Sequence, residues 1–461
     1  MFLGRGSLRA VADQAPPAAE IEPEVQRVGQ SLAAGLPSGA QHPIRNLDAK
    51  AMELATQDAQ LRSALFRLVD VTPATRSLDD LARHLRGYLS EVDDRPTPVD
   101  AAMRMANSRA GRQALGVAVA AGVRHMAHRF IVGETPAAAL GTIRSQWKGG
   151  IATSLDLLGE ATVTQTEADR YAARCSEALE TVSADATSWP SRPALEQDSV
   201  GPLPRVNVSV KVSALTPLMR PEAPLVGRDD AAGRLRPLLR LARDLDAHLH
   251  VDMESLDTLE ATTDLFFELL GEEEFRRGPS AGLVLQAYLR ESPAQLDRVL
   301  DWARATGRTP PLVIRLVKGA YWDHEVVEAR QHGWTPPVFE VKSDCDRNFE
   351  RLAARLVEAR PVVRVAIASH NLRSVAHAIA SSRAAGGEDR DLEIQVLRGL
   401  GDELAQALAA QGLRVRSYCP VGDLVAGMAY LVRRLLENTS NESFLQSWRE
   451  GAALEELLAA P

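Results

Sequence analysis

Charged and hydrogen-bonding side chains stand at the ends of short apolar segments in the second part of the chain. Lys211 ends one such segment, Asp252 ends the next, and Arg315 lies inside a third. An ammonium, a carboxylate and a guanidinium gathered in one place could bind an anionic small molecule and balance charge during a reaction. These residue types therefore predict a site for a small, charged ligand.

The remaining apolar segments bring groups of the same kind. They end in or carry a carboxylate, amides, phenols, a hydroxyl and an imidazole. These residues are Glu160, Gln286, Tyr288, Ser369, His370, Gln395 and Tyr418. A framework that served only as a scaffold would not need a polar group at nearly every segment end. The pattern favours an active site where these ends meet.

Each of the leading residues also has a purely structural interpretation. Lys211 alone fits a solvated strand end, and Asp252 alone fits a helix N-cap. Arg315 lies within the apolar run 313–317, where a charge is rarely buried without an anionic partner. Its candidate partners are Asp252 and a ligand phosphate.

Two further patterns remain open. His248 and His250 would share one strand face, a spacing that can suit a metal, but no third ligand clearly completes a set, so a structural role is favoured. Gly399 and Gly401 follow a strand and precede a helix, where backbone N–H groups could face a phosphate; a tight turn explains them equally well.

The segment 427–438 has the clearest helical pattern. Its apolar residues recur every three or four positions, at Met428, Leu431, Val432, Leu435 and Leu436. Arg433, Arg434 and Glu437 lie off that stripe. They form either a solvated face with an Arg–Glu pair or two guanidiniums presented to a carboxylate.

The elements that must position these residues alternate between strand and helix. Eight strands are predicted, over residues 152–160, 205–213, 249–254, 283–289, 312–318, 365–370, 393–398 and 415–420. Helical patterns separate most of them, over 231–246, 256–270, 294–306, 348–359, 372–380 and 403–410. Eight repeats favour a closed (βα)8 barrel, whose active site lies at the carboxyl ends of the strands. The rival is an open, doubly wound sheet, but no Gly-x-Gly-x-x-Gly follows the first strand.

The chain is predicted to divide into four parts. Residues 1–45 are read as a flexible tail, 46–147 as a helical arm or domain, 148–450 as the barrel and 451–461 as a C-terminal tail. Within the barrel, the Pro-rich segment 190–204, with Glu196 and Asp198, is read as a long surface loop.

Composition excludes several classes of protein. Hydrophobic residues make up 45% of the 461 residues and charged residues 25%, as in ordinary globular proteins. The net charge of −8 argues against nucleic acid as a main partner. No apolar run is long enough to cross a membrane, the N-terminus is a poor signal peptide, and three separated cysteines favour neither disulfides nor a zinc site. A reducing cytoplasm is the simplest setting.

Eight motifs carry a family resemblance. VSVKVSAL, HVDMES, LVLQAYL, IRLVKGAYWD, ASHN, QVLRGLG, YCPVG and YLVRRLLEN closely resemble the flavin-dependent proline dehydrogenases in order and spacing. The resemblance is closest to the proline dehydrogenase portion of bifunctional proline-utilisation proteins. It runs from about residue 47 to residue 444.

The resemblance implies a distorted (βα)8 barrel whose last helix covers the barrel mouth. It implies oxidation of L-proline to Δ1-pyrroline-5-carboxylate, with FAD as cofactor and a membrane quinone as acceptor. The expected partners are therefore L-proline, the quinone through transient peripheral membrane contact, and a separate or fused pyrroline-5-carboxylate dehydrogenase, without nucleic acid. The expected location is the cytoplasm or the inner face of the cell membrane.

The resemblance also assigns residues by matching motif. The catalytic residues would be Lys211, Asp252, Arg315, Tyr418, Arg433 and Arg434. Arg433, Arg434 and Lys211 would hold the substrate carboxylate, Glu437 would balance the arginines, and the ring would lie against Ala320, Tyr321, Leu397 and Tyr418. The flavin would be lined by Asp252, Gln286, Arg315, Val317, Lys318, Gly319, Ala320, Trp322, Lys342, Ser369, His370, Gln395, Leu397, Arg434, Glu437, Ser443 and Phe444.

The match has departures, and two other functions stay open. Glu340 and Cys345 replace threonines near the adenosine end, and Arg398 and Leu400 replace the histidine and methionine of a common HGMG form. No obvious side chain deprotonates the substrate amine. One alternative is an aldolase-like lyase that uses Lys211 as a Schiff-base amine. The other is a silent barrel that docks to a separate pyrroline-carboxylate dehydrogenase. Whether the chain stands alone or is part of a longer enzyme is left open.

Overall fold

The computed structural model describes residues 18–36, 59–93, 95–159, 161–423, 427, 447–448 and 451–461. Five residues predicted for the site lie outside this part of the chain: Arg433, Arg434, Glu437, Ser443 and Phe444. Glu160 and most of the segment 427–438 lie outside it as well.

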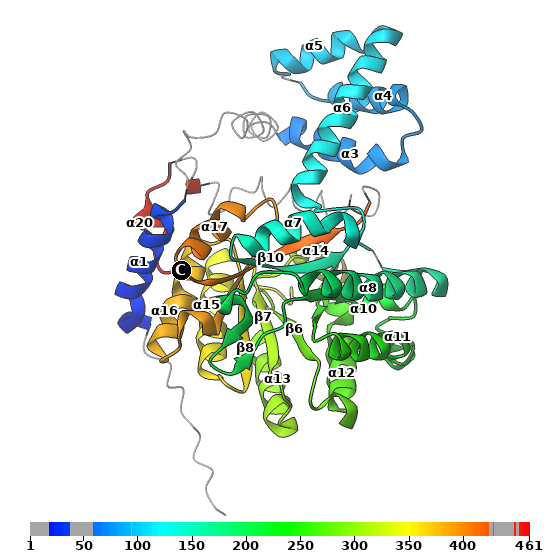
Figure 1. Ribbon diagram of the computed structural model, residues 1–461. Coiled ribbons are helices and arrows are strands. Elements are labelled where there is room, and N and C mark those ends of the chain that lie inside the picture. Colours follow the sequence, from blue (N-terminus) through cyan, green and yellow to red (C-terminus); the bar gives the residue numbers. More distant parts are fainter. Residues whose placement is uncertain are drawn as a thin grey trace, which may run out of the picture.

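Eight parallel strands form a closed barrel (Figure 1). The strands follow one another around the barrel in chain order, and β10 closes against β1, which also pairs with β4. They are β1 (Ile151–Leu157), β4 (Asn207–Lys211), β5 (His248–Asp252), β6 (Ser280–Gln286), β7 (Leu312–Val317), β8 (Val363–Ala368), β9 (Leu392–Leu397) and β10 (Arg414–Val421). The predicted barrel is confirmed, and each of the eight predicted strands overlaps one of these.

Helices surround the barrel. They are α7 (Pro136–Lys148), α8 (Gln165–Ala186), α10 (Val212–Leu215), α11 (Pro224–Asp244), α12 (Leu256–Gly271), α13 (Ser292–Thr306), α14 (Trp322–His332), α15 (Lys342–Glu358), α16 (Leu372–Ala384) and α17 (Asp402–Ala410). The six helical patterns predicted between the strands all coincide with helices, which begin one to seven residues earlier than expected in four cases. Short helices η2 (Glu273–Phe275) and η3 (Asp389–Asp391) complete the connections.

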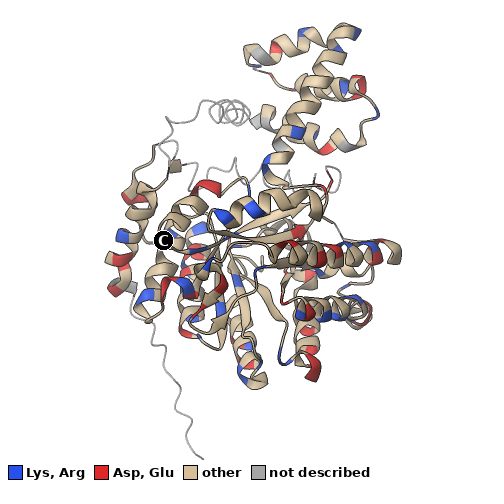
Figure 2. Cartoon of the chain, viewed as in Figure 1, with Lys and Arg blue, Asp and Glu red and all other residues tan. Residues whose placement is uncertain are grey.

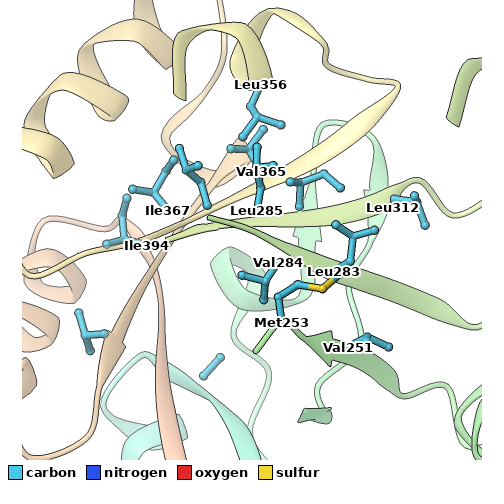
Figure 3. Close-up of a cluster of buried hydrophobic side chains, with 14 of the residues drawn as sticks. Val251, Met253, Leu283, Val284, Leu285, Leu312, Leu356, Val365, Ile367 and Ile394 are labelled. Carbon is cyan, nitrogen blue, oxygen red and sulfur yellow. The ribbon is translucent and has the colours of Figure 1, made fainter. Parts of the chain in front are cut away.

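The main core lies between the outer faces of the strands and these helices. Figure 3 shows aliphatic side chains from β5 to β9, among them Val251, Leu283, Val365 and Ile394, gathered with Leu356 of α15. Residues two apart in a strand point to the same side. The apolar side chains therefore fill the outer layer and leave the alternate positions for the barrel interior.

A helical arm precedes the barrel (Figure 1). It comprises α3 (Ala59–Val71), η1 (Thr72–Ala74), α4 (Leu78–Leu89), α5 (Thr97–Met105) and α6 (Arg109–Phe130). The arm has its own small core, which includes Leu68, Leu81 and Leu85. The end of α6 contacts the barrel: Phe130 is fully buried, and Arg129 Nε donates to the carbonyl of Gly399 at 3.2 Å. The arm is thereby joined to the loop that follows β9.

Both predicted tails need correction. Residues 18–34 form helix α1 (Ala18–Ala34), which packs on α16, and α20 (Leu454–Leu457) lies beside it (Figure 1). Leu458 is fully buried, and its carbonyl accepts a hydrogen bond from Gln26 Nε2 at 2.9 Å. The Ala- and Pro-rich sequence did not indicate this helix, because its apolar side chains become buried only against a distant part of the barrel.

The segment 190–204 is also different from the predicted surface loop. It forms α9 (Pro193–Glu196) and a short hairpin of β2 (Gln197–Asp198) and β3 (Gly201–Pro202). Asp198 is 3% exposed and pairs with the buried Arg364 at 2.9 Å. The segment therefore closes the amino end of the barrel.

Charges of both signs are interspersed over the outer helices in the view of Figure 2. Among the described helices, none is both long enough and apolar enough to cross a bilayer.

Candidate active site

Asp252 is the centre of a polar network at the carboxyl end of the barrel. Arg315 Nη1 donates to Asp252 Oδ1 at 2.6 Å, and the Tyr418 hydroxyl donates to Asp252 Oδ2 at 2.6 Å. Lys211 Nζ lies 3.8 Å from the same Oδ2. Four of the six predicted catalytic residues, from four different strands, are therefore in one cluster.

Strand register explains this convergence. Lys211 pairs with Asp252 where β4 and β5 run side by side, so the two side chains leave the strands at the same height. Arg315 lies deeper in the barrel, is 4% exposed and reaches upward to Asp252. Its guanidinium also lies over the Tyr418 ring, with 5.2 Å between the Cζ atom and the ring centroid. Of the two partners considered for Arg315, the structure has Asp252.

Two residues of this cluster were missed by the sequence analysis. Asp156 of β1 is 1% exposed and its carboxylate pairs directly with the Lys211 ammonium. Ser209 Oγ accepts a hydrogen bond from Arg315 Nη2 at 3.1 Å. Asp156 interrupts the apolar run of β1 much as Arg315 interrupts that of β7. This charged residue within a strand could have predicted Asp156 as a member of the site.

The electrostatics of the cluster fix two protonation states near neutral pH. Burial opposes the positive charge of Lys211, but the carboxylates of Asp156 and Asp252 outweigh it and raise the pKa of Lys211 above its ordinary value. Burial and the same two carboxylates raise the pKa of Tyr418 well above its ordinary value. Lys211 is therefore a cation and Tyr418 a neutral hydrogen-bond donor.

The predicted flavin-lining residues occupy neighbouring strand ends. Gln286 ends β6, Val317 ends β7, and Gln395 lies on β9. Gln286 Nε2 donates to the carbonyl of Glu254 at 3.1 Å, while its buried Oε1 has no hydrogen-bond partner among the described residues. A buried acceptor without a donor is costly unless a ligand supplies one.

Two predicted lysines meet on a shared carboxylate. Lys318 pairs with Asp346, and Lys342 Nζ lies 2.6 Å from Asp346 Oδ2. Asp346, the fifth residue of α15, was not predicted. This arrangement leaves two cations on one anion, a net positive charge that suits a phosphate group. The Gln286 amide and the two lysines therefore offer a hydrogen-bonding group and positive charge to a ligand, whereas the Gln395 amide donates to Glu393 at 2.6 Å.

The loop after β7 carries three further predicted residues. Gly319 has a φ of +141°, and a Cβ there would lie 2.4 Å from the Tyr288 ring, so a side chain is excluded at this position. Ala320 is exposed, and Tyr321 is half-buried. Trp322 begins α14 and donates from Nε1 to the carbonyl of Phe339 at 2.9 Å.

The residues after β8 have contacts within the protein. His370 Nε2 accepts a hydrogen bond from the backbone N–H of Leu397 at 2.9 Å, and Ser369 Oγ accepts one from Asn371 N at 3.1 Å. Asn371 caps α16. His370 thus holds the end of β9, where Leu397 stands, and its Nε2 lone pair is already used.

The histidine pair lies below the site. His248 Nε2 and His250 Nδ1 are 3.0 Å apart, and His248 Nδ1 lies 2.8 Å from Ser280 Oγ. Burial and nearby arginines hold the pKa of both imidazoles well below the ordinary value. Among the described residues, no group of His, Cys, Asp and Glu side chains could hold a metal ion.

Gly399 and Gly401 form a tight turn. Gly399 has a φ of +83°, and a Cβ there would lie 2.7 Å from the Phe130 ring of the arm. A Cβ on Gly401 would lie 2.8 Å from the His370 ring. Close packing accounts for both glycines.

Comparison with known proteins agrees with this geometry. Residues 139–447 match the model of the proline dehydrogenase family, and residues 22–130 match the proline utilization A N-terminal domain. The bifunctional protein PutA of Salmonella typhimurium is 33% identical over 351 residues, which cover 74% of this chain and 25% of that protein. The proline dehydrogenase of Deinococcus radiodurans is 28% identical over 322 residues, which cover 70% of this chain and 89% of that protein.

A solved structure is similar over nearly the whole chain. The crystal structure of proline utilization A from Bdellovibrio bacteriovorus, inactivated by N-propargylglycine, has a TM-score of 0.87 and 34% identity, covering 96% of this chain and 44% of that one. The chain spans about a quarter of the length of the curated PutA relatives that it matches. With two-thirds of its length matched by the family model, the chain belongs to the proline dehydrogenase family.

Proposed function

We propose that the protein is an FAD-dependent proline dehydrogenase that oxidises L-proline to Δ1-pyrroline-5-carboxylate. The observation that carries the proposal is the network in which Lys211, Arg315 and Tyr418 converge on Asp252, at the end of a barrel whose family oxidises proline. The polar ends of the strands then serve binding and electrostatics around a small anionic substrate.

Lys211 is proposed to bind the substrate carboxylate together with Arg433 and Arg434. Its ammonium is held charged by Asp156 and Asp252, so it is ready to pair with an anion without prior protonation. Tyr418 and Leu397 lie on adjacent, paired strands and are proposed to pack against the substrate ring, with Ala320 and Tyr321 completing the wall. Glu437 is proposed to balance the two arginines.

The residues proposed to hold FAD are the strand-end groups already described. Gln286 and Gln395 offer amides to the ring system, and Lys318 and Lys342 offer cations to the phosphates. Val317, Gly319, Trp322, Ser369, His370, Ser443 and Phe444 complete the proposed lining. When bound, FAD supplies the acceptor for the hydride that leaves the substrate. Arg315 is proposed to stabilise negative charge in this region.

The rival lyase function is disfavoured by the state of Lys211. A Schiff-base lysine attacks as the neutral amine and needs a lowered pKa. The paired carboxylates raise the pKa of Lys211 instead. The docking-barrel alternative predicts that the chain binds neither flavin nor proline. The visible absorption spectrum of the purified chain therefore tests it as well.

The proposal includes two partners. One is a membrane quinone as electron acceptor, and the other is a fused or separate pyrroline-5-carboxylate dehydrogenase. The proposal also includes the division into an arm over 46–147 and a catalytic barrel over 148–450. The membrane contact is proposed to be peripheral and transient. Sedimentation with lipid vesicles irrespective of flavin redox state would contradict transient contact.

The visible absorption spectrum of the purified chain, before and after anaerobic L-proline, tests the proposed function. A flavin spectrum that bleaches with proline is the expected result. A flavin that stays oxidised would exclude proline as substrate. A colourless protein that also fails to take up added FAD would overturn the flavoenzyme assignment.

A further inference from the structure

A cavity with arginines in its lining lies at the opposite end of the barrel from the candidate active site. It has a volume of about 830 Å³ and is lined by the segments that lead into β4, β5, β6, β7 and β8, among them 277–280, 307–311 and 361–364. All strands are parallel, so these segments meet at the amino end of the barrel. No residue of the Asp252 network lines this cavity.

The charge of the lining is strongly positive. Arg243, Arg277, Arg304, Arg308 and Arg364 line the cavity, against one carboxylate, Asp246. Arg243 and Arg304 have acidic neighbours of their own, at 3.1 Å from Asp244 and 3.2 Å from Asp301 respectively. Arg277 is exposed and has no ion pair with any residue that the structure describes.

Arg308 is the most informative residue. It is 6% exposed, and its guanidinium donates only to backbone carbonyls: to Phe275 at 3.0 Å, to Pro310 at 2.9 Å, and to Pro279. Within the described chain no carboxylate pairs with it. Burial without a counter-ion lowers the pKa of Arg308 to about 10. A buried charge of this kind is costly unless an anion neutralises it.

Buried arginines behind the cavity wall add to the excess of positive charge. Arg364 lines the cavity, and behind it Arg414 and Arg416 complete a cluster with only two carboxylates, Asp198 and Glu393. All five side chains are at most 7% exposed. Arg364 Nη1 is buried and has no hydrogen-bond partner among the described residues. Three buried guanidiniums thus share two carboxylates, and one positive charge is left over beside the cavity.

We propose that this cavity is a binding site for a phosphate group carried by a small molecule. Arg277, Arg308 and the buried cluster leave three positive charges without a paired carboxylate, and Asp246 in the lining reduces the excess to two. A phosphate monoester has close to two negative charges at neutral pH, which match this excess, and guanidinium forks bind phosphate oxygens bidentately. The volume is within the range of small-molecule sites. Six prolines line the walls and offer apolar surface to the rest of the molecule: Pro202, Pro204, Pro279, Pro310, Pro311 and Pro361.

The test is calorimetric titration of the full chain saturated with FAD, at neutral pH and low ionic strength, with inorganic phosphate and with adenosine monophosphate as probes. Saturable binding of either probe is expected. Tighter binding of the nucleotide would identify an organic phosphate as the ligand class, and equal affinities would identify free phosphate; both support the site.

Matched variants decide whether the cavity is responsible. Arg308→Gln removes three hydrogen bonds to the loops and can fail to fold, so rim variants carry the test. Arg277→Glu reverses a charge on the cavity lining and should weaken probe binding by about tenfold or more. Arg276→Glu makes the same change one residue away, outside the lining, and should leave the affinity unchanged. Absence of saturable binding, binding that Arg277→Glu leaves unchanged, or equal weakening by both variants would overturn the proposal.

Discussion

The two ends of the barrel use the same residue types for different purposes. At the carboxyl end, Lys211 and Arg315 face Asp156 and Asp252, so the described cluster balances two cations with two carboxylates. At the amino end, Arg364, Arg414 and Arg416 share Asp198 and Glu393, and one cation is in excess. Lys211 and Asp252 keep 14% and 12% of their side-chain surface exposed, whereas the amino-end cluster is almost completely buried.

This difference in solvent exposure distinguishes charged residues that can bind a ligand from charged residues that stabilise the fold. A cluster that keeps some exposure can exchange one of its partners for a ligand, as a substrate site must. A fully buried cluster holds strands together and reaches the neighbouring cavity only through Arg364, and removal of one member leaves an uncompensated charge. The following predictions test that contrast, from the largest expected effect to the smallest.

Asp198→Ala should produce the largest loss of stability. Asp198 is shared by Arg364 at 2.9 Å and Arg414 at 3.4 Å, and all three side chains are at most 3% exposed. Breaking a buried pair by removing one partner costs about 3–5 kcal/mol of unfolding free energy. Urea denaturation followed by circular dichroism measures it.

The control for Asp198 is Glu273→Ala. Glu273 pairs with Arg276 at 3.4 Å, and both side chains are mostly exposed. The loss there should be about 1 kcal/mol or less. Equal losses in the two variants would remove the distinction between buried and exposed charge.

Acid should weaken the amino end through Glu393. Burial raises the pKa of Glu393, but Arg416 and Arg414 outweigh it and lower that pKa from 4.5 to about 2. A depressed folded-state pKa contributes stability that is complete above the unfolded value and is lost as the pH falls through the folded value. The contribution should be about 3 kcal/mol, lost as the pH falls from roughly 5 to roughly 2. Unfolding free energies measured across this range should show a slope that Glu393→Gln reduces.

Lys211→Met should lower both catalysis and stability, because it also removes the cation that pairs with the buried Asp156 carboxylate. The variant loses one charged partner of the substrate carboxylate, which is worth about 2–3 kcal/mol, or roughly a 30- to 100-fold fall in kcat/KM for proline. Steady-state kinetics with an artificial electron acceptor measure it. Lys148→Met, at an exposed lysine at the end of α7, is the control and should leave kcat/KM unchanged. An unchanged KM in Lys211→Met would refute the proposed carboxylate contact.

Tyr418→Phe should have the smallest effect on the same network. It removes only the hydroxyl that donates to Asp252 at 2.6 Å and keeps the ring beside Arg315. The loss of one hydrogen bond to a carboxylate should lower kcat/KM by about tenfold. Tyr88→Phe in the arm is the matched control. A fall as large as that of Lys211→Met would mean that Tyr418 does more than donate this hydrogen bond.

The barrel could be predicted because its signals are local. Alternating apolar strands and helical patterns mark each βα unit, and polar residues such as Lys211 and Asp252 mark the strand ends. The helix α1 could not be predicted in this way, because its stability depends on packing against α16 and α20, which lie hundreds of residues away. Ion pairs from Glu22 to Arg373 and from Glu24 to Arg383 hold it there.

The sequence by itself determined the fold class, the family resemblance and the residue types of the site, because each depends on short motifs and on the period of the hydrophobic pattern. Only the tertiary structure decided which charges face each other. Asp156 pairs with Lys211, and Asp346 pairs with two lysines. Asp198, which was predicted to lie in a surface loop, is buried and pairs with buried arginines. Strand register and barrel closure bring these partners together. The residues that neighbour each partner along the chain do not indicate which distant residue it will contact.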